Sequence, residues 1–209
     1  MKLKSSILAL SLMVPFGAMA DHDNTVIDGL DFGPLAQFVG TWKSVETGGV
    51  DISPAQEGTP QGKGGPAVTP FYEVMTFEVA ADAVNASEQT LVALYYKQEV
   101  FRKADDSKFH DQRGYFIYDK DNQMVYNSFC VPRTTCVTAE GVAGNEMSLK
   151  VAARGIAESN YMTANASTTD FSMNIKIDGD TLTYSQTTAL DIYNSSFAHT
   201  DSSVLERVK

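Results

Sequence analysis

The sequence predicts an all-β protein, a single antiparallel up-and-down β-barrel of about ten strands with a short helical turn before the first strand. Segments in which apolar and polar residues alternate follow one another from Gly40 to the end of the chain. No long segment with helical periodicity separates them, so parallel crossovers are not expected. Because almost no helix is available to cover a sheet, the strands must pack as a sandwich or close into a barrel. Closure also removes exposed strand edges.

The N-terminus has the pattern of a secretory signal peptide. Lys2 and Lys4 precede the apolar run 7–16, which is followed by the small-residue segment 18–20. The run is shorter than the roughly 20 residues that a membrane-spanning helix needs. We therefore expect a secreted or periplasmic protein without a membrane span, organised as a signal peptide (1–20), a polar lead-in (21–30) and one barrel domain (31–209).

The first elements of the domain are a helical turn at 32–39 and a strand that begins at Gly40. Later strand patterns occupy 71–79, 90–101, 114–118, 124–130, 147–152, 171–177, 181–190 and 204–208. Turn residues at Asp119–Asn122 and Asp178–Asp180 separate neighbouring patterns, as in antiparallel hairpins. Gly48 to Pro70 and Ala157 to Thr169 are rich in Gly, Pro, Ser and Asn, and are expected to be loops that either cover a barrel end or move freely.

Composition excludes several classes of function. Acidic residues outnumber basic ones by 26 to 16, giving a formal net charge of −10, which argues against nucleic acid or an anionic membrane as partner. The two cysteines, Cys130 and Cys136, favour a disulfide in an oxidising compartment; their spacing fits neither a zinc site nor covalent haem attachment. Hydrolase, zinc-protease and nucleotide-binding fingerprints are absent from the sequence.

The two ends of the domain carry a matching pair of residues. Gly40-Thr41-Trp42 opens the first strand, and Arg207 lies at the end of the last one. These strands are neighbours in a closed barrel, so the Arg207 guanidinium can lie across the Trp42 indole, a cation–π contact of roughly 0.5–2 kcal/mol. The combination resembles the calycin superfamily, where the contact has a structural role.

Further segments, read in order, resemble the nitrobindin family of haem-binding barrels. They are Pro34-Leu35-Ala36, Gly40-Thr41-Trp42, Tyr72-Glu73, Phe109-His110-Asp111-Gln112-Arg113-Gly114-Tyr115-Phe116, Leu182-Thr183-Tyr184 and His199 followed by Leu205-Glu206-Arg207-Val208. The resemblance implies a b-type haem near the barrel mouth, held by one histidine, with the other iron face open in an apolar pocket. Carried over, the iron ligand is His199; a surface position is the alternative. Glycines that usually follow the family's tryptophan are displaced here to Gly48 and Gly49.

Other candidate cofactor-binding residues surround this assignment. The resemblance places His110 near the haem, although a solvent-exposed hairpin position is equally compatible with its sequence. Tyr95, Met75 and Phe77 suit pocket walls or ordinary core. Arg113 could pair with a haem propionate, as could Lys103 and Lys108. Asp201 is a candidate acceptor for the second imidazole nitrogen of His199.

Three functions remain open from the sequence. The first is a ferric haem b protein whose open iron face takes nitric oxide or peroxynitrite, with peroxynitrite isomerisation implied by the family resemblance only. The second is a carrier of a fatty acid or other small apolar ligand, with His199 turned outward and an Arg–Tyr clamp inside. The third is a structural or interaction barrel with a filled interior. Nothing in the sequence predicts the oligomeric state.

Overall fold

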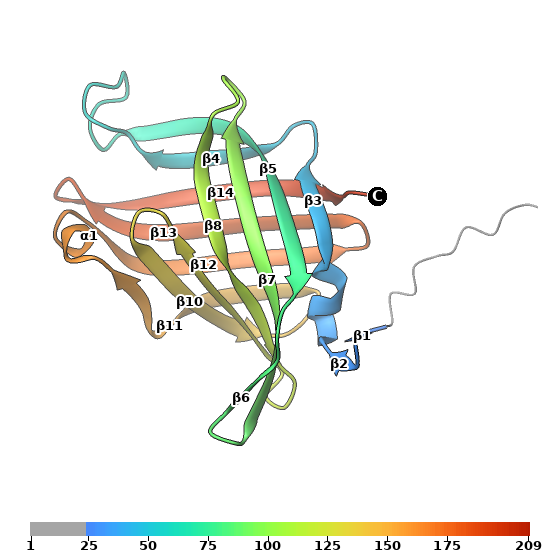
Figure 1. The fold of residues 1–209 in the computed structure, drawn as a ribbon. Coiled ribbons are helices and arrows are strands. Elements are labelled where there is room, and N and C mark those ends of the chain that lie inside the picture. Colours follow the sequence, from blue (N-terminus) through green and yellow to red (C-terminus); the bar gives the residue numbers. More distant parts are fainter. Residues whose placement is uncertain (1–23) are drawn as a thin grey trace, which may run out of the picture.

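The computed structural model describes residues 24–209, which form a closed ten-stranded antiparallel barrel (Figure 1). Its ten wall positions are formed by eleven strands, because β3 and β4 share one position: β3 (Gly40–Ser44), β4 (Gly49–Pro54), β5 (Pro66–Val79), β7 (Gln89–Arg102), β8 (Lys108–Asp119), β9 (Met124–Val131), β10 (Thr135–Val142), β11 (Glu146–Glu158), β12 (Ala166–Asp178), β13 (Thr181–Ile192) and β14 (Ser195–Arg207). Smaller elements are β1 (Val26–Ile27), β2 (Leu30–Asp31), the 3₁₀ helix η1 (Gly33–Phe38), β6 (Ala83–Asn85) and α1 (Asn160–Asn165). The predicted fold class is confirmed.

Strands β3 and β4 share one position in the barrel wall. Each pairs with β5 on one side and with β14 on the other, β3 near one end and β4 near the other. The backbone breaks between them at Gly48, where φ is +67° and an added Cβ would lie 2.1 Å from the Phe71 carbonyl oxygen. This glycine therefore permits the close approach that lets β4 rejoin the sheet.

Two predicted loops are wrong in part. Gly48 to Pro70 contains β4 and the start of β5, and Ala157 to Thr169 contains the end of β11, the helix α1 and the start of β12. Strand β10 was also not predicted. The segment Val50-Asp51-Ile52-Ser53 alternates over only four residues and is flanked by Gly and Pro, so its sequence did not indicate a strand. Its strand conformation depends on hydrogen bonds to the two long neighbouring strands, β5 and β14.

The end of the barrel next to η1 is closed by the predicted cation–π contact. The Arg207 guanidinium lies 4.2 Å from the centre of the Trp42 ring and donates hydrogen bonds to the carbonyls of Val39 and Gln37, each at 2.7 Å. The Trp42 indole N–H donates to the Phe38 carbonyl at 2.8 Å. These contacts tie η1 to the first and last strands.

The apolar core packs directly against η1. It is apolar and rich in aromatic rings, and includes Phe38, Trp42, Phe77, Leu94 and Phe116. Above it lies a layer of buried polar side chains: Glu73, Gln98, Gln112 and Asn127. The opposite end of the barrel is therefore the end available for a ligand.

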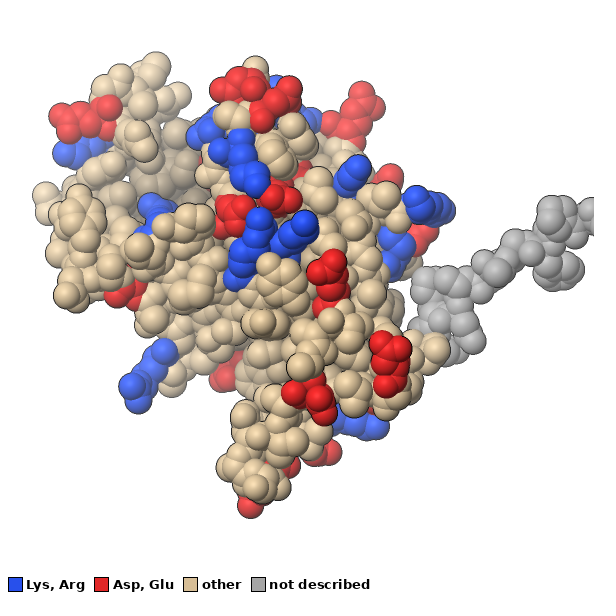
Figure 2. Space-filling view, in the orientation of Figure 1, with Lys and Arg blue, Asp and Glu red and all other residues tan. Residues whose placement is uncertain are grey.

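The hairpin of β9 and β10 carries the disulfide predicted from the sequence. Cys130 and Cys136 are opposite each other in the strand register and are bonded. On the face seen in Figure 2, basic and acidic side chains lie next to one another, with no large area of one sign. Among residues 24–209 no helix has the length and apolar character needed to cross a membrane. The predicted signal peptide lies outside the described residues.

Candidate functional site

A cavity of about 660 Å³ opens at the barrel end opposite η1. Cofactor pockets typically measure roughly 300–1,000 Å³. The strand connections at this end contribute Gln56, Pro132 and Tyr193 to its wall, and both His110 and His199 line it. The structure therefore brings the two predicted site histidines into one cavity.

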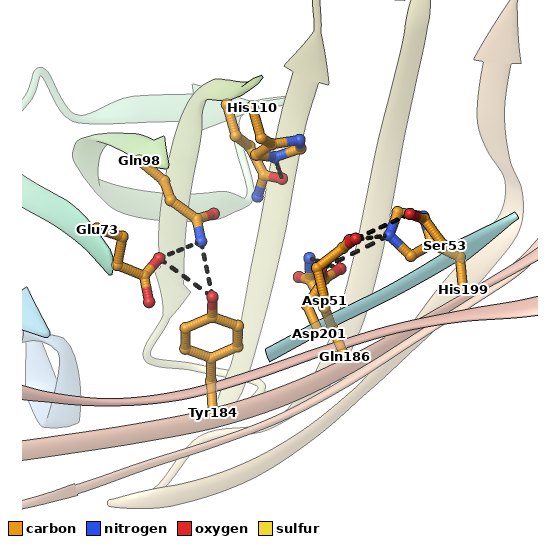
Figure 3. A network of polar contacts seen from close by, with 10 residues as sticks. Asp51, Ser53, Glu73, Gln98, His110, Tyr184, Gln186, His199 and Asp201 are labelled. Carbon is orange, nitrogen blue, oxygen red and sulfur yellow. Dashed lines mark hydrogen bonds and ion pairs between the residues drawn. The ribbon is translucent and has the colours of Figure 1, made fainter. Parts of the chain in front are cut away.

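His199 is held by two carboxylates (Figure 3). Its Nε2 lies 2.6 Å from Asp51 Oδ1 and 3.6 Å from Asp201 Oδ1. The strand register explains the cluster: Asp51 on β4 is opposite Asp201 on β14, and His199, two residues before Asp201, shares its inward face. The side chains of His199 and Asp51 are only 17% and 4% exposed. Asp201 was the predicted acceptor; the direct partner is Asp51.

The two carboxylates set the protonation of the imidazole. Burial acts to lower the pKa of His199, but Asp201 and Asp51 overcome it and raise that pKa to about 9. Burial raises the pKa of Asp51, whereas the imidazolium and the Gln186 amide lower the pKa of Asp201 in spite of its burial. Within residues 24–209 no hydrogen bond reaches His199 Nδ1, so this nitrogen is the one available to a ligand.

The remaining oxygens of the cluster are supported by neighbouring side chains. The Ser53 hydroxyl donates to Asp51 Oδ2 at 2.8 Å, and Gln186 Nε2 donates to Asp201 Oδ2 at 3.2 Å. The ligand atoms of Asp51, His199 and Asp201 lie within 4.8 Å of one another, close enough to share a metal ion. The group is therefore fixed in orientation from both neighbouring strands.

His110 occupies a different part of the cavity wall. Its Nε2 lies 3.3 Å from Gln112 Oε1, and the Gln112 amide in turn donates to the Tyr96 hydroxyl. Burial lowers the pKa of His110, so the ring is neutral near pH 7. It is a hydrogen-bonding group for a ligand rather than a charged one.

The floor of the cavity is polar. Gln98, Tyr184 and Gln186 line it, and the first two bind the carboxyl of Glu73 directly beneath. Burial raises the pKa of Glu73 to about 7. The expectation of an apolar pocket is therefore wrong at the floor; the apolar part of the wall is made by residues such as Phe71, Val100, Phe109 and Val131.

Four predicted cofactor-binding residues do not line the cavity. Tyr95 faces outward, where its ring packs edge-on against Tyr115, with the ring centres 5.8 Å apart. Met75 and Phe77 point inward but belong to the apolar core near η1. Arg113 is on the outer surface of β8, paired with Asp111 at 2.8 Å. Residues along a strand point alternately to the inner and the outer face of the barrel, and Tyr95 and Arg113 occupy outward positions.

Of the three basic residues expected to pair with a haem propionate, only Lys108 is on the cavity wall. Arg133 and Lys108 line the cavity. Lys108 Nζ is paired with Glu99, whereas Lys103 donates to the carbonyls of Glu46 and Thr47 and has no place in the lining. Arg133, which sequence reasoning missed, is therefore the better placed partner for an anionic group at the mouth.

Sequence reasoning also missed most of the polar residues at the site. Asp51 was hidden in a segment interpreted as a loop, and Glu73, Gln98 and Gln186 were not singled out. A signal was available for the last three, since each is a polar residue at an inward position of an otherwise apolar strand face. Such residues are typical of a buried polar network or a site.

Comparisons with known proteins agree with this description. The model of the THAP4-like, heme-binding beta-barrel domain matches residues 31–207. The crystal structure of Rv2717c from M. tuberculosis is similar with a TM-score of 0.57 and 19% sequence identity, covering 84% of this chain and 95% of that chain. At this identity the likeness bears on the fold alone. No curated protein matches the chain.

Proposed function

Because the chain belongs to the THAP4-like, heme-binding β-barrel family, with the nitrobindin-like barrel that its motifs predicted, we propose that it binds haem b through His199. The observation that carries the proposal is the His199–Asp51 pair inside the cavity. Haem-ligating and other metal-ligating histidines commonly give their second nitrogen to a carboxylate, which fixes the tautomer and raises the basicity of the ligand. Here Nε2 would serve Asp51, and Nδ1 would serve the iron once the imidazolium has released its Nδ1 proton to solvent.

The remaining lining residues support one orientation of the ring. Asp51 and Asp201 are at the inner part of the cavity, where they disfavour a second anionic group. Lys108 and Arg133 are the lining cations, and they suit the propionates as ion-pair partners. The aromatic and aliphatic wall that includes Phe71 and Val100 would pack against the porphyrin faces.

For the open iron face we propose nitric oxide or peroxynitrite as the small ligand. Bound haem supplies the ferric iron that takes the ligand. The neutral His110 supplies a hydrogen-bonding group beside it, and the floor formed by Gln98 and Tyr184 restricts the space below. The signal-peptide pattern at residues 1–20 supports the proposal that the protein meets such ligands outside the cytoplasm.

The carrier hypothesis receives less support. It called for an Arg–Tyr clamp inside the barrel and for His199 turned outward. His199 instead points into the cavity, and the acidic pair Asp51 and Asp201 beside it would repel a fatty-acid carboxylate.

Haem titration of purified apoprotein tests the proposal. The wild type is expected to develop a Soret band that saturates at one haem per chain. His199→Ala is expected to lose the band or hold haem at least tenfold more weakly, while the matched variant His110→Ala keeps stoichiometric binding. Failure of the wild type to bind haem, or equal binding by His199→Ala, would overturn the proposal.

A further inference from the structure

Glu73 is a buried acid with incomplete hydrogen bonding. It lies on β5, and only 1% of its surface is exposed. Its Oε2 accepts hydrogen bonds from Gln98 Nε2 at 2.6 Å and from the Tyr184 hydroxyl at 3.1 Å. Within residues 24–209 its Oε1 has no partner. A carboxylate in this position is poorly stabilised, because a buried anion needs a hydrogen bond or a cation at each oxygen.

A single layer of side chains separates Glu73 from the cavity. Gln98 and Tyr184, which bind its carboxyl, both line the cavity, and Gln98 Nε2 also donates to the Tyr184 hydroxyl at 3.0 Å. Figure 3 shows the three groups converging on one another, with Glu73 at the left, on the side away from Asp51 and His199. Glu73 is therefore outside the ligand space but hydrogen-bonded to its floor.

The surroundings of Glu73 contain no compensating positive charge within the described chain. The groups around its carboxyl are Gln98 on β7, Tyr184 on β13, and Ser203 and Asp201 on β14; Ser44 on β3 accepts a hydrogen bond from the Glu73 backbone N–H. Of these, Asp201 carries a negative charge, which reaches Glu73 through the interior and disfavours its ionised form. The Asp51–His199 pair lies beyond Asp201. Charges act on one another more strongly in the protein interior than in water.

We propose that Glu73 is a proton-accepting group coupled to the charge of a haem in the cavity. The inference rests on the proposed function. When an external one-electron reductant converts ferric to ferrous haem, the site loses one positive charge, and one solvent proton binds to the Glu73 carboxylate. The electron stays on the iron, the new bond is the carboxyl O–H, and no other bond changes. Burial raises the pKa of Glu73 to about 7, which makes the uptake measurable near neutral pH.

Asp119 offers a matched control. It is also a fully buried carboxyl, but it accepts hydrogen bonds from Asn122 and Gln89 and lies at the far end of β8 from His110. These hydrogen bonds overcome the effect of burial and lower the pKa of Asp119. It should stay ionised whatever the charge in the cavity.

The test is a mediated redox titration of the haem-loaded protein over about pH 5 to pH 9. The midpoint potential of the wild type is expected to fall as pH rises around neutrality. The slope of potential against pH should approach the value for one proton taken up with each electron. Glu73→Gln should lose most of that slope, and Asp119→Asn should keep it. Redox-difference infrared spectra should show a protonated carboxyl band appearing on reduction in the wild type and absent in Glu73→Gln.

The outcomes separate this inference from the proposed function. No haem binding by the wild type overturns both. Haem binding with a pH-independent potential, or with the wild-type slope retained in Glu73→Gln, overturns the role of Glu73 alone. If Glu73→Gln does not fold, Tyr184→Phe serves instead: losing one hydrogen bond to the carboxylate should move the sloping region to higher pH. If the midpoint potential of Tyr184→Phe slopes over the same pH range as that of the wild type, the inference is contradicted.

Discussion

Asp51 and Asp201 face each other across the pair formed by β4 and β14, and the His199 imidazole lies beside both carboxylates. Two like charges directly opposite each other destabilise a sheet unless a cation or proton lies between them. With its pKa raised to about 9, the His199 imidazole is the group that supplies this charge near neutral pH. Strand β4 therefore contributes to the proposed site. It carries Asp51, the hydrogen-bond partner that orients His199, the proposed iron ligand.

Replacing Asp51 with Asn should weaken haem retention. The amide keeps the shape but removes the anionic acceptor, and changes of this kind at the partner of a ligating histidine typically cost about 10–100-fold. The rate of haem transfer to excess apomyoglobin measures the effect. Val50→Ala, on the outward face of the same strand, is the control and should transfer haem at the wild-type rate. Equal rates for the two variants would contradict the role of Asp51.

The sequence allowed the closed barrel, the disulfide and the Trp42–Arg207 contact to be predicted. Each depends on local alternation or on which strands must be neighbours in a closed sheet. The partner of His199 could not be found in this way, because Asp51 lies in a six-residue strand whose conformation depends on pairing with β5 and β14. Tyr95 could not be placed for a related reason, since the sequence does not say which of two neighbouring strand residues points inward.

Protonation of Glu73 should make the barrel more stable at low pH. Its folded pKa, about 7, lies above the ordinary value of 4.5, so the folded state retains a proton that the unfolded state releases between these values. The contribution of Glu73 to the free energy of unfolding is fully present below about pH 4.5 and is lost as pH rises through about 7. Relative to Glu73→Gln, the wild-type unfolding free energy should fall by about 2–3 kcal/mol between pH 5 and pH 8.

Urea unfolding of both proteins at the two pH values provides the measurement. Comparison with Glu73→Gln removes the contributions of His199 and the other titrating groups. A constant difference between the two proteins across this range would show that Glu73 is ionised throughout.

Removing the Arg207 guanidinium should destabilise the barrel without affecting haem. Arg207→Met leaves the carbonyls of Val39 and Gln37 without their donors and removes the contact with Trp42, at an expected cost of about 2–4 kcal/mol. Denaturant unfolding measures the loss. Lys209→Met, at an 85% exposed position two residues later, should change stability by less than about 0.5 kcal/mol. A haem affinity that falls in Arg207→Met but not in Lys209→Met would argue against a purely structural role.

The disulfide should stabilise the β9–β10 hairpin and the cavity wall that it carries. Val131, Pro132 and Arg133 lie between the two bonded cysteines and line the cavity. Replacing Cys130 and Cys136 with Ser should lower stability by about 2 kcal/mol through the greater entropy of the unfolded chain, and should speed haem release. Thermal unfolding and haem transfer measure these two effects. Unchanged haem release in the double variant would separate the disulfide from the site.

The central claim is that a haem iron binds the nitrogen of His199 that Asp51 leaves free. A crystal structure of the haem-loaded protein tests it most directly. The account predicts iron bonded to His199 Nδ1, with Nε2 still hydrogen-bonded to Asp51 and the propionates toward Arg133. Iron bonded to His110, or a haem bound outside the cavity with the Asp51–His199–Asp201 cluster intact, would contradict it.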